Sequence, residues 1–272
     1  MEMKKAPALA LSVGRKEQVG RDGFAAMRAC GIGAVELSFG DYDGFDFQGV
    51  KTLADQFGVA LWSLHLPFMP FEEIDISFLD NEKRRATLQK LCGTMEQAIA
   101  IGIDKFVVHA SGEPALPSER EKRLQCSEDS LFTLSEYAKK GKAMVAVENL
   151  PRTCLGNCSE EINRLAAVND NVAVCFDTNH LFLESHREFT QNLKKEILTV
   201  HISDYDFSGE KHWMPGQGKL DWQEIIRLLA GKGYTGPWLY EVSFTQKAPP
   251  EEKELTFADF AENHRKLFAG NL

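Results

Sequence analysis

The feature that most constrains this chain is a repeated alternation between short apolar runs and longer amphipathic stretches. Several of the runs are rich in Val, Ile and aromatic residues, a composition typical of parallel strands that are buried on both faces. Eight strands alternating with eight helices form the repeat of a (β/α)8 TIM barrel, which is the predicted fold class. The predicted strands are 8–13, 34–39, 59–66, 105–110, 143–150, 172–177, 197–202 and 237–244. The predicted helices are 21–30, 47–57, 81–101, 117–140, 159–168, 187–195, 222–232 and 250–269.

Local signals at the expected helix ends agree with this prediction. Glu160 and Glu161 would lie in the first turn of a helix, where acidic side chains oppose the partial positive charge of the N-terminus. Gly58 and Gly233 stand where helices are expected to end. No Pro/Ser-rich linker divides the chain, so we predict one domain over residues 1–272. The segments 41–47, 68–81 and 205–220 follow strands and are predicted to be loops over the catalytic face.

The composition excludes several classes of protein. With 31 Lys and Arg against 40 Asp and Glu, the formal net charge is −9, and no basic patch suited to nucleic-acid phosphates stands out. No apolar run approaches the ~20 residues of a membrane-spanning helix. The six cysteines lack the spacing of a disulfide framework or a zinc site, which indicates a reducing compartment. We therefore expect a cytoplasmic protein with a small-molecule partner and no nucleic-acid or membrane partner; the sequence is compatible with a homo-oligomer.

Ionisable residues stand at the carboxyl ends of four consecutive predicted strands. They are Glu148, Asp177, His201 and Glu241, and each closes or follows an apolar run. The C-terminal ends of barrel strands converge on one rim, where TIM barrels carry their active sites. Burying three carboxylates together is costly unless protons or a cation compensate their charge. Three carboxylates and an imidazole suit one divalent ion (Mn²⁺, Mg²⁺, Co²⁺ or Zn²⁺), and we predict these four residues as its ligands.

Four further polar residues follow the same positional pattern. Glu36, His65 and His109 lie late in the second, third and fourth predicted strands, and His180 lies three residues beyond Asp177. Each alone is explained equally well by a polar side chain that is satisfied near a strand end. Their shared location at one rim favours a functional role.

Several segments resemble a known family. The strongest are 145–149 (VAVEN), 176–180 (FDTNH), 200–204 (VHISD), 215–222 (PGQGKLDW) and 233–242 (GYTGPWLYEV), with looser matches at 35–37 (VEL), 64–66 (LHL) and 107–109 (VVH). The strong matches span the second half of the chain in the family's order, and the looser ones lie in the first half. The chain resembles the xylose-isomerase-like barrel superfamily, in particular its sugar phosphate isomerase/epimerase group, which includes ketose 3-epimerases, inosose dehydratases and hydroxypyruvate isomerases.

The resemblance implies a metal-dependent isomerase or epimerase of a sugar, sugar phosphate or polyol. In that family a Glu, an Asp, a His and a Glu on strands five to eight hold the metal, and in the epimerases the two metal-bound glutamates also transfer the proton. An enediolate is the expected intermediate, because a chelated carbonyl acidifies the neighbouring C–H bond. Carried over, the ligands are Glu148, Asp177, His201 and Glu241, the acid/base pair is Glu148 and Glu241, and Glu36, His65, His109 and His180 bind the substrate.

The chain departs from the ketose 3-epimerases at two points. Those enzymes have a further glutamate shortly after the strand-five ligand and an arginine shortly after the strand-seven histidine. Here the segments 151–154 (PRTC) and 204–207 (DYDF) occupy those stretches. This disfavours a ketose 3-epimerase and leaves an isomerase or epimerase of another sugar or polyol.

Two alternative functions stay open. The same superfamily contains apurinic endonucleases, phosphodiesterases whose two- or three-metal clusters add histidines on strands three and four and after the strand-six Asp. His65, His109 and His180 stand in those places, with His212 in the following loop, whereas the net charge of −9 argues against a DNA substrate. The second alternative is a non-catalytic sugar-binding barrel, which a missing metal carboxylate would have signalled.

Overall fold

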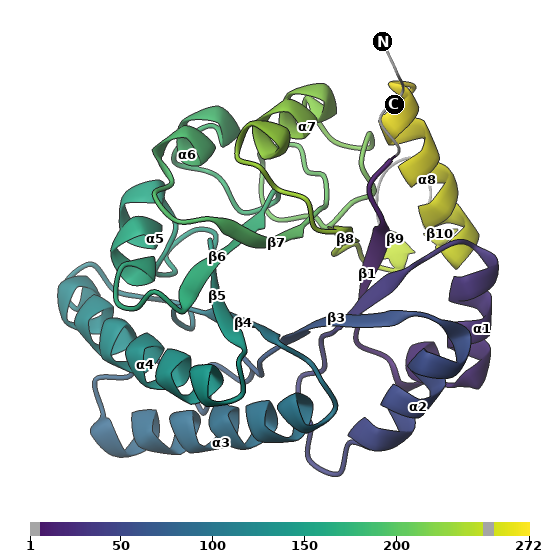
Figure 1. Ribbon diagram of the computed structural model, residues 1–272. Coiled ribbons are helices and arrows are strands. Elements are labelled where there is room, and N and C mark those ends of the chain that lie inside the picture. The colour runs from purple at the N-terminus through teal and green to yellow at the C-terminus, as the bar shows by residue number, and fades with distance from the viewer. Residues whose placement is uncertain (1–5, 247–252) are drawn as a thin grey trace.

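The computed structural model describes residues 6–246 and 253–272, and its parallel strands form a barrel surrounded by helices (Figure 1). The barrel strands are β1 (Leu9–Val13), β2 (Ala34–Leu37), β3 (Ala60–His65), β4 (Lys105–His109), β5 (Met144–Glu148), β6 (Val172–Asp177), β7 (Ile197–His201) and β8 (Trp238–Tyr240). The α-helices are α1 (Arg21–Ala29), α2 (Phe47–Phe57), α3 (Asn81–Ala100), α4 (Arg120–Lys140), α5 (Ser159–Ala166), α6 (His186–Asn192), α7 (Trp222–Gly231) and α8 (Phe257–Ala269). The predicted (β/α)8 TIM barrel is thus confirmed.

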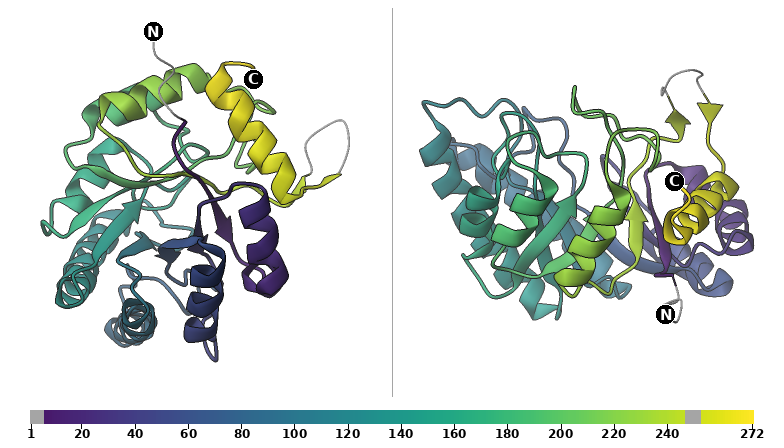
Figure 2. Two further views of the ribbon diagram at one scale, coloured as in Figure 1. Left: turned by 45° about the vertical axis from the view of Figure 1, so that its right-hand side comes forward. Right: turned by 90° about the horizontal axis from the view of Figure 1, so that it is seen from above.

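The strands follow one another around the barrel in chain order, with β8 beside β1. β7 and β8 meet through a single parallel bridge between Ile202 and Tyr240. Ile202 N donates to Leu239 O at 2.8 Å, and Glu241 N donates to Ile202 O at 3.1 Å. The long loops after the strands rise at one end of the barrel, and β1 begins at the other end (Figure 2).

The two-residue repeat of the strands separates the core into an outer and an inner part. In β5, Val145 and Val147 belong to the large apolar cluster between sheet and helices, whereas Ala146 packs with Val107 and Cys175 in a separate small cluster. Because alternate side chains of a strand share a face, the next position on the side of Ala146 is Glu148. The same step leads from Cys175 to Asp177 and from Val107 to His109. The polar rim is therefore the next layer above the apolar interior.

The element boundaries differ from the prediction mainly at the catalytic end. β2 and β8 stop short of the predicted residues 39 and 244, because the chain there turns into loops. The prediction of a helix over 250–269 was wrong at its start: residues 253–254 pair antiparallel with residues 245–246, and α8 begins at Phe257. Thr256 and Asp259 form a capping box that fixes this start. Residues 250–252 of that prediction lie outside the described residues. Within the described part of the chain, no helix has the length and hydropathy needed to cross a bilayer.

Candidate metal centre and active site

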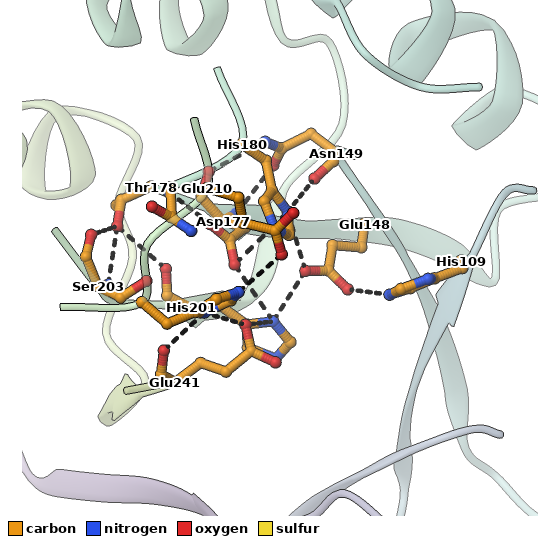
Figure 3. Close-up of polar contacts among 12 residues, drawn as sticks. His109, Glu148, Asn149, Asp177, Thr178, His180, His201, Ser203, Glu210 and Glu241 are labelled. Atoms are coloured by element: carbon orange, nitrogen blue, oxygen red, sulfur yellow. Dashed lines mark hydrogen bonds and ion pairs between the residues drawn. The ribbon is translucent and has the colours of Figure 1, made fainter. Parts of the chain in front are cut away.

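The four predicted metal ligands come together at the C-terminal rim of the barrel (Figure 3). One ligand atom from each of Glu148, Asp177, His201 and Glu241 lies within 4.8 Å of the others. The first three side chains are at most 1% exposed, and that of Glu241 is 23% exposed. The only one of the four with access to solvent is therefore the ligand that follows β8.

Two carboxylate oxygens in this group fit a cation. Asp177 Oδ2 and Glu241 Oε2 are buried and accept no hydrogen bond from the described residues. A buried acceptor without a partner costs about 1–3 kcal/mol, and more when it is charged. Burial, with the like charges of Glu241 and Glu148, raises the pKa of Asp177 to about 8. A divalent ion would satisfy both oxygens and remove this repulsion, so the donor set fits a metal.

The orientation of His201 is fixed by a buried carboxylate. Its Nε2 lies 3.0 Å from Glu36 Oε1, and its Nδ1 lies 3.0 Å from Glu148 Oε1. Glu36 is fully buried and also accepts a hydrogen bond from Ser63 Oγ at 2.7 Å. When Nε2 donates its proton to Glu36, Nδ1 presents a lone pair to the carboxylate group, as in the carboxylate–histidine–metal arrangement. The structure thus places Glu36 beneath His201, although the sequence analysis expected it at the substrate.

Asn149 holds the end of β6 in place. Its side-chain oxygen accepts a hydrogen bond from Asp177 N at 2.8 Å, and its side-chain nitrogen donates to Asp177 O at 3.0 Å. These two hydrogen bonds resemble those between neighbouring strands, and they fix the backbone position of Asp177, a candidate metal ligand. Asn149 belongs to the segment 145–149, whose pattern did not predict this role.

His65 and His109 lie on the other side of Glu148. The Nε2 atoms of the two histidines are 3.2 Å and 3.3 Å from Glu148 Oε2, while Oε1 of the same carboxylate faces His201. His65 Nδ1 is 2.8 Å from Leu66 O, a carbonyl that can only accept, so Nδ1 carries a proton. Glu148 therefore lies between two sets of histidines: its Oε1 faces His201, and its Oε2 faces His65 and His109.

A third group of donors includes a residue that the sequence analysis missed. His180, Glu210 and His212 have ligand atoms within 4.8 Å of one another. His212 Nε2 is 2.8 Å from Glu210 Oε1, and His180 Nε2 is 3.4 Å from the same atom. The Nδ1 atoms of both histidines face backbone carbonyls, of Asn149 and Glu241, at 3.0 Å. As in His65, Nδ1 of each histidine therefore carries a proton, and Nε2 faces a carboxylate.

Charges around Glu210 raise the pKa values of both histidines. Burial lowers the pKa of His180, but the charge of Asp177 and the contact with Glu210 outweigh it and raise this pKa to about 10. Burial likewise opposes, and the hydrogen bond to Glu210 raises, the pKa of His212 to about 9. The pKa of Glu210 is lowered, because its histidine partners outweigh its burial.

Glu210 is held from outside the site by Arg152. Arg152 Nη1 lies 2.6 Å from Glu210 Oε2, and Arg152 Nη2 lies 2.8 Å from Glu113 Oε2. These three residues come from the loops after β7, β5 and β4. Arg152 has a φ of +53°, an unusual value for a side-chain-bearing residue, and Asn157 Nδ2 donates to its carbonyl at 2.7 Å. Arg152 thus connects the loops after β4, β5 and β7. Its contacts with Glu113 and Glu210 run from the surface of the protein toward the buried site.

The loop that carries Glu210 is shaped by the segment 215–222. Asp204 accepts hydrogen bonds from Gly216 N and Trp222 Nε1, at 2.8 Å and 2.9 Å. A Cβ at Gly218 would lie 2.2 Å from Asp204 Oδ1, so only glycine fits there. Asp204 also forms a backbone bridge with Trp213. The Gly-rich motif therefore folds the loop back so that the residue before Trp213, His212, reaches the site.

Comparisons with known proteins agree with this architecture. A family model described as "Xylose isomerase-like TIM barrel" matches residues 24–260. The uncharacterized protein MJ1311 of Methanocaldococcus jannaschii is 25% identical over 176 residues, which cover 61% of this chain and 60% of that protein. The aligned part is thus about three fifths of the length of the first curated relatives.

Solved structures are similar over the whole chain. A D-tagatose 3-epimerase-like protein has a TM-score of 0.79 at 18% identity, with 97% of each chain covered. The 3-keto-D-glucoside 4-epimerase of E. coli has a TM-score of 0.74 at 19% identity, covering 98% of this chain and 100% of that one. At such identities the similarity is one of fold.

Proposed function

Because this chain belongs to the xylose isomerase-like TIM barrel family, we propose that it is a divalent-metal-dependent isomerase or epimerase of a sugar, sugar phosphate or polyol. The observation that carries the proposal is the pairing of two glutamates about His201. Glu148 and Glu241 bring carboxylate oxygens within 4.8 Å of one another at the mouth of the barrel, and Glu241 Oε2 accepts no hydrogen bond from the described residues. Two such groups are what a two-step proton transfer needs.

Each residue of the proposed site has a separate task. Glu148, Asp177, His201 and Glu241 would hold the ion, which when bound polarises a carbonyl and a neighbouring hydroxyl of the substrate. One glutamate removes the proton from the acidified carbon, and the other returns it at the opposite face or at the next carbon. His65, His109 and His180 lie around Glu148, and their Nε2 atoms can exchange the carboxylates that they contact for hydroxyl groups of a substrate. Glu36 keeps the proton of His201 on Nε2.

Exchange of a carbon-bound substrate proton with D₂O tests the proposal. NMR would follow this exchange for ketoses, inososes and small hydroxy-ketones with the metal-loaded protein. Glu148→Gln and Glu241→Gln should each lower the exchange rate by the ~10²–10⁴ that positioned acid–base groups contribute. Glu160→Gln, on the exposed start of α5, is the control and should exchange at the wild-type rate. Absence of exchange in the whole panel with wild-type protein would contradict the proposal.

A second candidate function is a multi-metal phosphodiesterase. The observation that favours it is the presence of two further groups of metal-type donors beside the first. His65, His109 and Glu148 form one, and His180, Glu210 and His212 form the other. Among the described residues Glu148 belongs to three of four such groups, because it also meets Cys175 and His201. A carboxylate that shares its oxygens between sites is suited to bridging two ions. Such clusters stabilise the attacking and leaving oxygens of a phosphoryl displacement.

The number of ions distinguishes the two functions. Elemental analysis of the purified protein should find one tightly bound divalent ion per chain for the isomerase. Two or three ions, with one lost in His109→Ala, together with cleavage of an oligonucleotide containing an abasic site, would replace it with the phosphodiesterase. The formal net charge of −9 weighs against a nucleic-acid substrate and favours the isomerase.

A further inference from the structure

A cavity beside the metal centre has no role in the proton transfer. It has a volume of about 400 Å³ and is bordered by Glu241 and His212 on the side of the metal centre. Its other walls come from the end of β1, the end of β2 and the segment after β8, including Gly14, Ser38 and Phe244. Because Glu241 borders both the cavity and the metal site, a substrate chelated at the metal can extend into this space.

Besides His212, two cationic side chains border the cavity in a chain that is acidic overall. They are Arg15, from the segment after β1, and Lys211, from the loop after β7. Arg15 forms a salt bridge of 2.9 Å with Glu254, but both side chains are about half exposed, at 47% and 57%. Such a pair contributes little to stability and can exchange for a ligand. Lys211 contacts the ring of Trp213 at 5.7 Å and forms no ion pair with another described residue.

The backbone around Arg15 is held in place. Gly14 N and Arg15 N both donate to Gln18 Oε1, at 3.1 Å and 2.9 Å, and Gln18 is buried. A Cβ at Gly14 would lie 2.6 Å from Ser38 O, so the close approach of these two segments requires glycine. This arrangement fixes the base from which the guanidinium extends. Fixed donors lose less entropy when they bind an anion than mobile ones do.

We propose that this cavity binds the terminal phosphate of a phosphorylated sugar, with Arg15 and Lys211 as its cationic partners. Arg15 offers a planar fork of N–H donors to phosphate oxygens, and Lys211 offers a compact charge. The hydroxyls of Ser12 and Ser38 border the same space. The inference rests on the proposed isomerase function and narrows its substrate class to phosphate esters. Arg15 and Lys211 on one cavity suit a single phosphate, whereas a nucleic-acid backbone needs a row of cations.

The first arm of the test measures binding rather than turnover. Calorimetric titration of the metal-loaded protein with inorganic phosphate compares wild type, Arg15→Gln and Lys211→Gln. Loss of a charge-assisted partner should weaken phosphate binding by about tenfold or more in each variant. Lys219→Gln, an exposed position on the same loop but outside the cavity lining, is the control. If phosphate bound only to the metal ion, its affinity would be the same in all four proteins. Equal affinity in all four would therefore overturn the proposal.

The second arm compares matched substrates by D₂O exchange. D-Ribulose 5-phosphate should exchange with a kcat/KM at least about tenfold above that of D-ribulose, and Lys211→Gln should remove this advantage through KM. A preference for the free sugar, or for a ketose that carries a carboxylate in place of phosphate, would overturn the phosphate assignment, as would displacement of phosphate by an oligonucleotide. Absence of exchange in every compound, with phosphate binding still dependent on Arg15 and Lys211, would contradict the isomerase and keep the anion site.

Discussion

Replacement of Glu36 by Gln tests how the candidate metal ligand His201 is oriented. Glu36 Oε1 accepts hydrogen bonds from His201 Nε2 at 3.0 Å and from Ser12 Oγ at 3.4 Å, and its Oε2 accepts one from Ser63 Oγ at 2.7 Å. A glutamine has the same shape but only one acceptor oxygen, so its amide nitrogen must face either His201 or Ser63. The Ser63 hydroxyl can turn and accept from that nitrogen, but in either orientation His201 Nε2 loses its carboxylate partner and faces an amide nitrogen or an uncharged oxygen instead. In this fully buried site the loss costs about 1–3 kcal/mol.

The expected result is a loss of metal affinity without loss of the fold. A partner that orients a metal-binding histidine typically contributes about 10–100-fold to affinity, or about 1.4–2.7 kcal/mol. Competition with a chromophoric chelator would measure the affinity, and circular dichroism would follow the fold. Ser63→Ala is the matched control, because it removes a partner of Glu36 and leaves the contact with His201 unchanged; it should weaken metal binding less.

The same variant separates two roles of Glu36. A positioning residue acts through the metal, so saturating metal should restore most of the turnover in Glu36→Gln with little change in the KM of the substrate. A residue that binds a substrate hydroxyl would instead raise KM at every metal concentration. Metal affinity within about twofold of wild type would refute the reasoning from the hydrogen-bond geometry.

Three further predictions concern the same rim. Because the pKa of Asp177 is raised to about 8, metal must displace its proton below that pH, and chelator competition should show affinity falling about tenfold per pH unit from pH 8 downward. Asp177→Asn should bind metal weakly yet keep its circular dichroism spectrum, and global unfolding of this variant would mark Asp177 as a core residue. A raised carboxyl pKa makes the metal-free wild-type fold lose stability as the pH rises from about 4 to about 8. The melting temperature of Asp177→Asn should therefore lack this loss over the same pH range. Arg152→Gln should release Glu210 and lower kcat/KM by about tenfold, whereas Arg187→Gln, which breaks an exposed pair with Glu224, should leave it unchanged.

The fold and the meeting of the four candidate metal ligands could be predicted because they depend on short repeats along the chain. The alternation of apolar runs and amphipathic stretches defines the barrel, and the two-residue period of each strand places the next inward side chain at the rim. This rule predicted Glu148, Asp177 and His201 as neighbours, and the structure brings their ligand atoms within 4.8 Å of one another and of Glu241. The rule does not say how far below the rim a side chain lies. It therefore could not distinguish Glu36, which is buried against His201, from residues that would face a substrate.

Residues on loops escaped the same reasoning. Glu210 and Arg152 stand on segments without a periodic pattern, and their meeting depends on the path of two loops that the sequence does not specify. The spacing of Glu210 and His212, which lets both side chains reach one point, is the signal that could have revealed the third donor group. The hairpin ahead of α8 was missed for a similar reason: residues 253–254 are polar and charged, and only pairing with residues 245–246 makes them a strand.

The seam between β7 and β8 has a consequence for solubility. β6 and β7 pair over four residues, whereas β7 and β8 are joined by one bridge near the ligand Glu241. Closure of a barrel hides every strand edge, and an open edge is a template for pairing with another chain. A substitution that parts Ile202 from Tyr240 would expose two edges at once, both lined by apolar residues. Variants at this seam would then be lost to aggregation during expression, so a defect that resembles a loss of catalysis would in fact be a loss of protein.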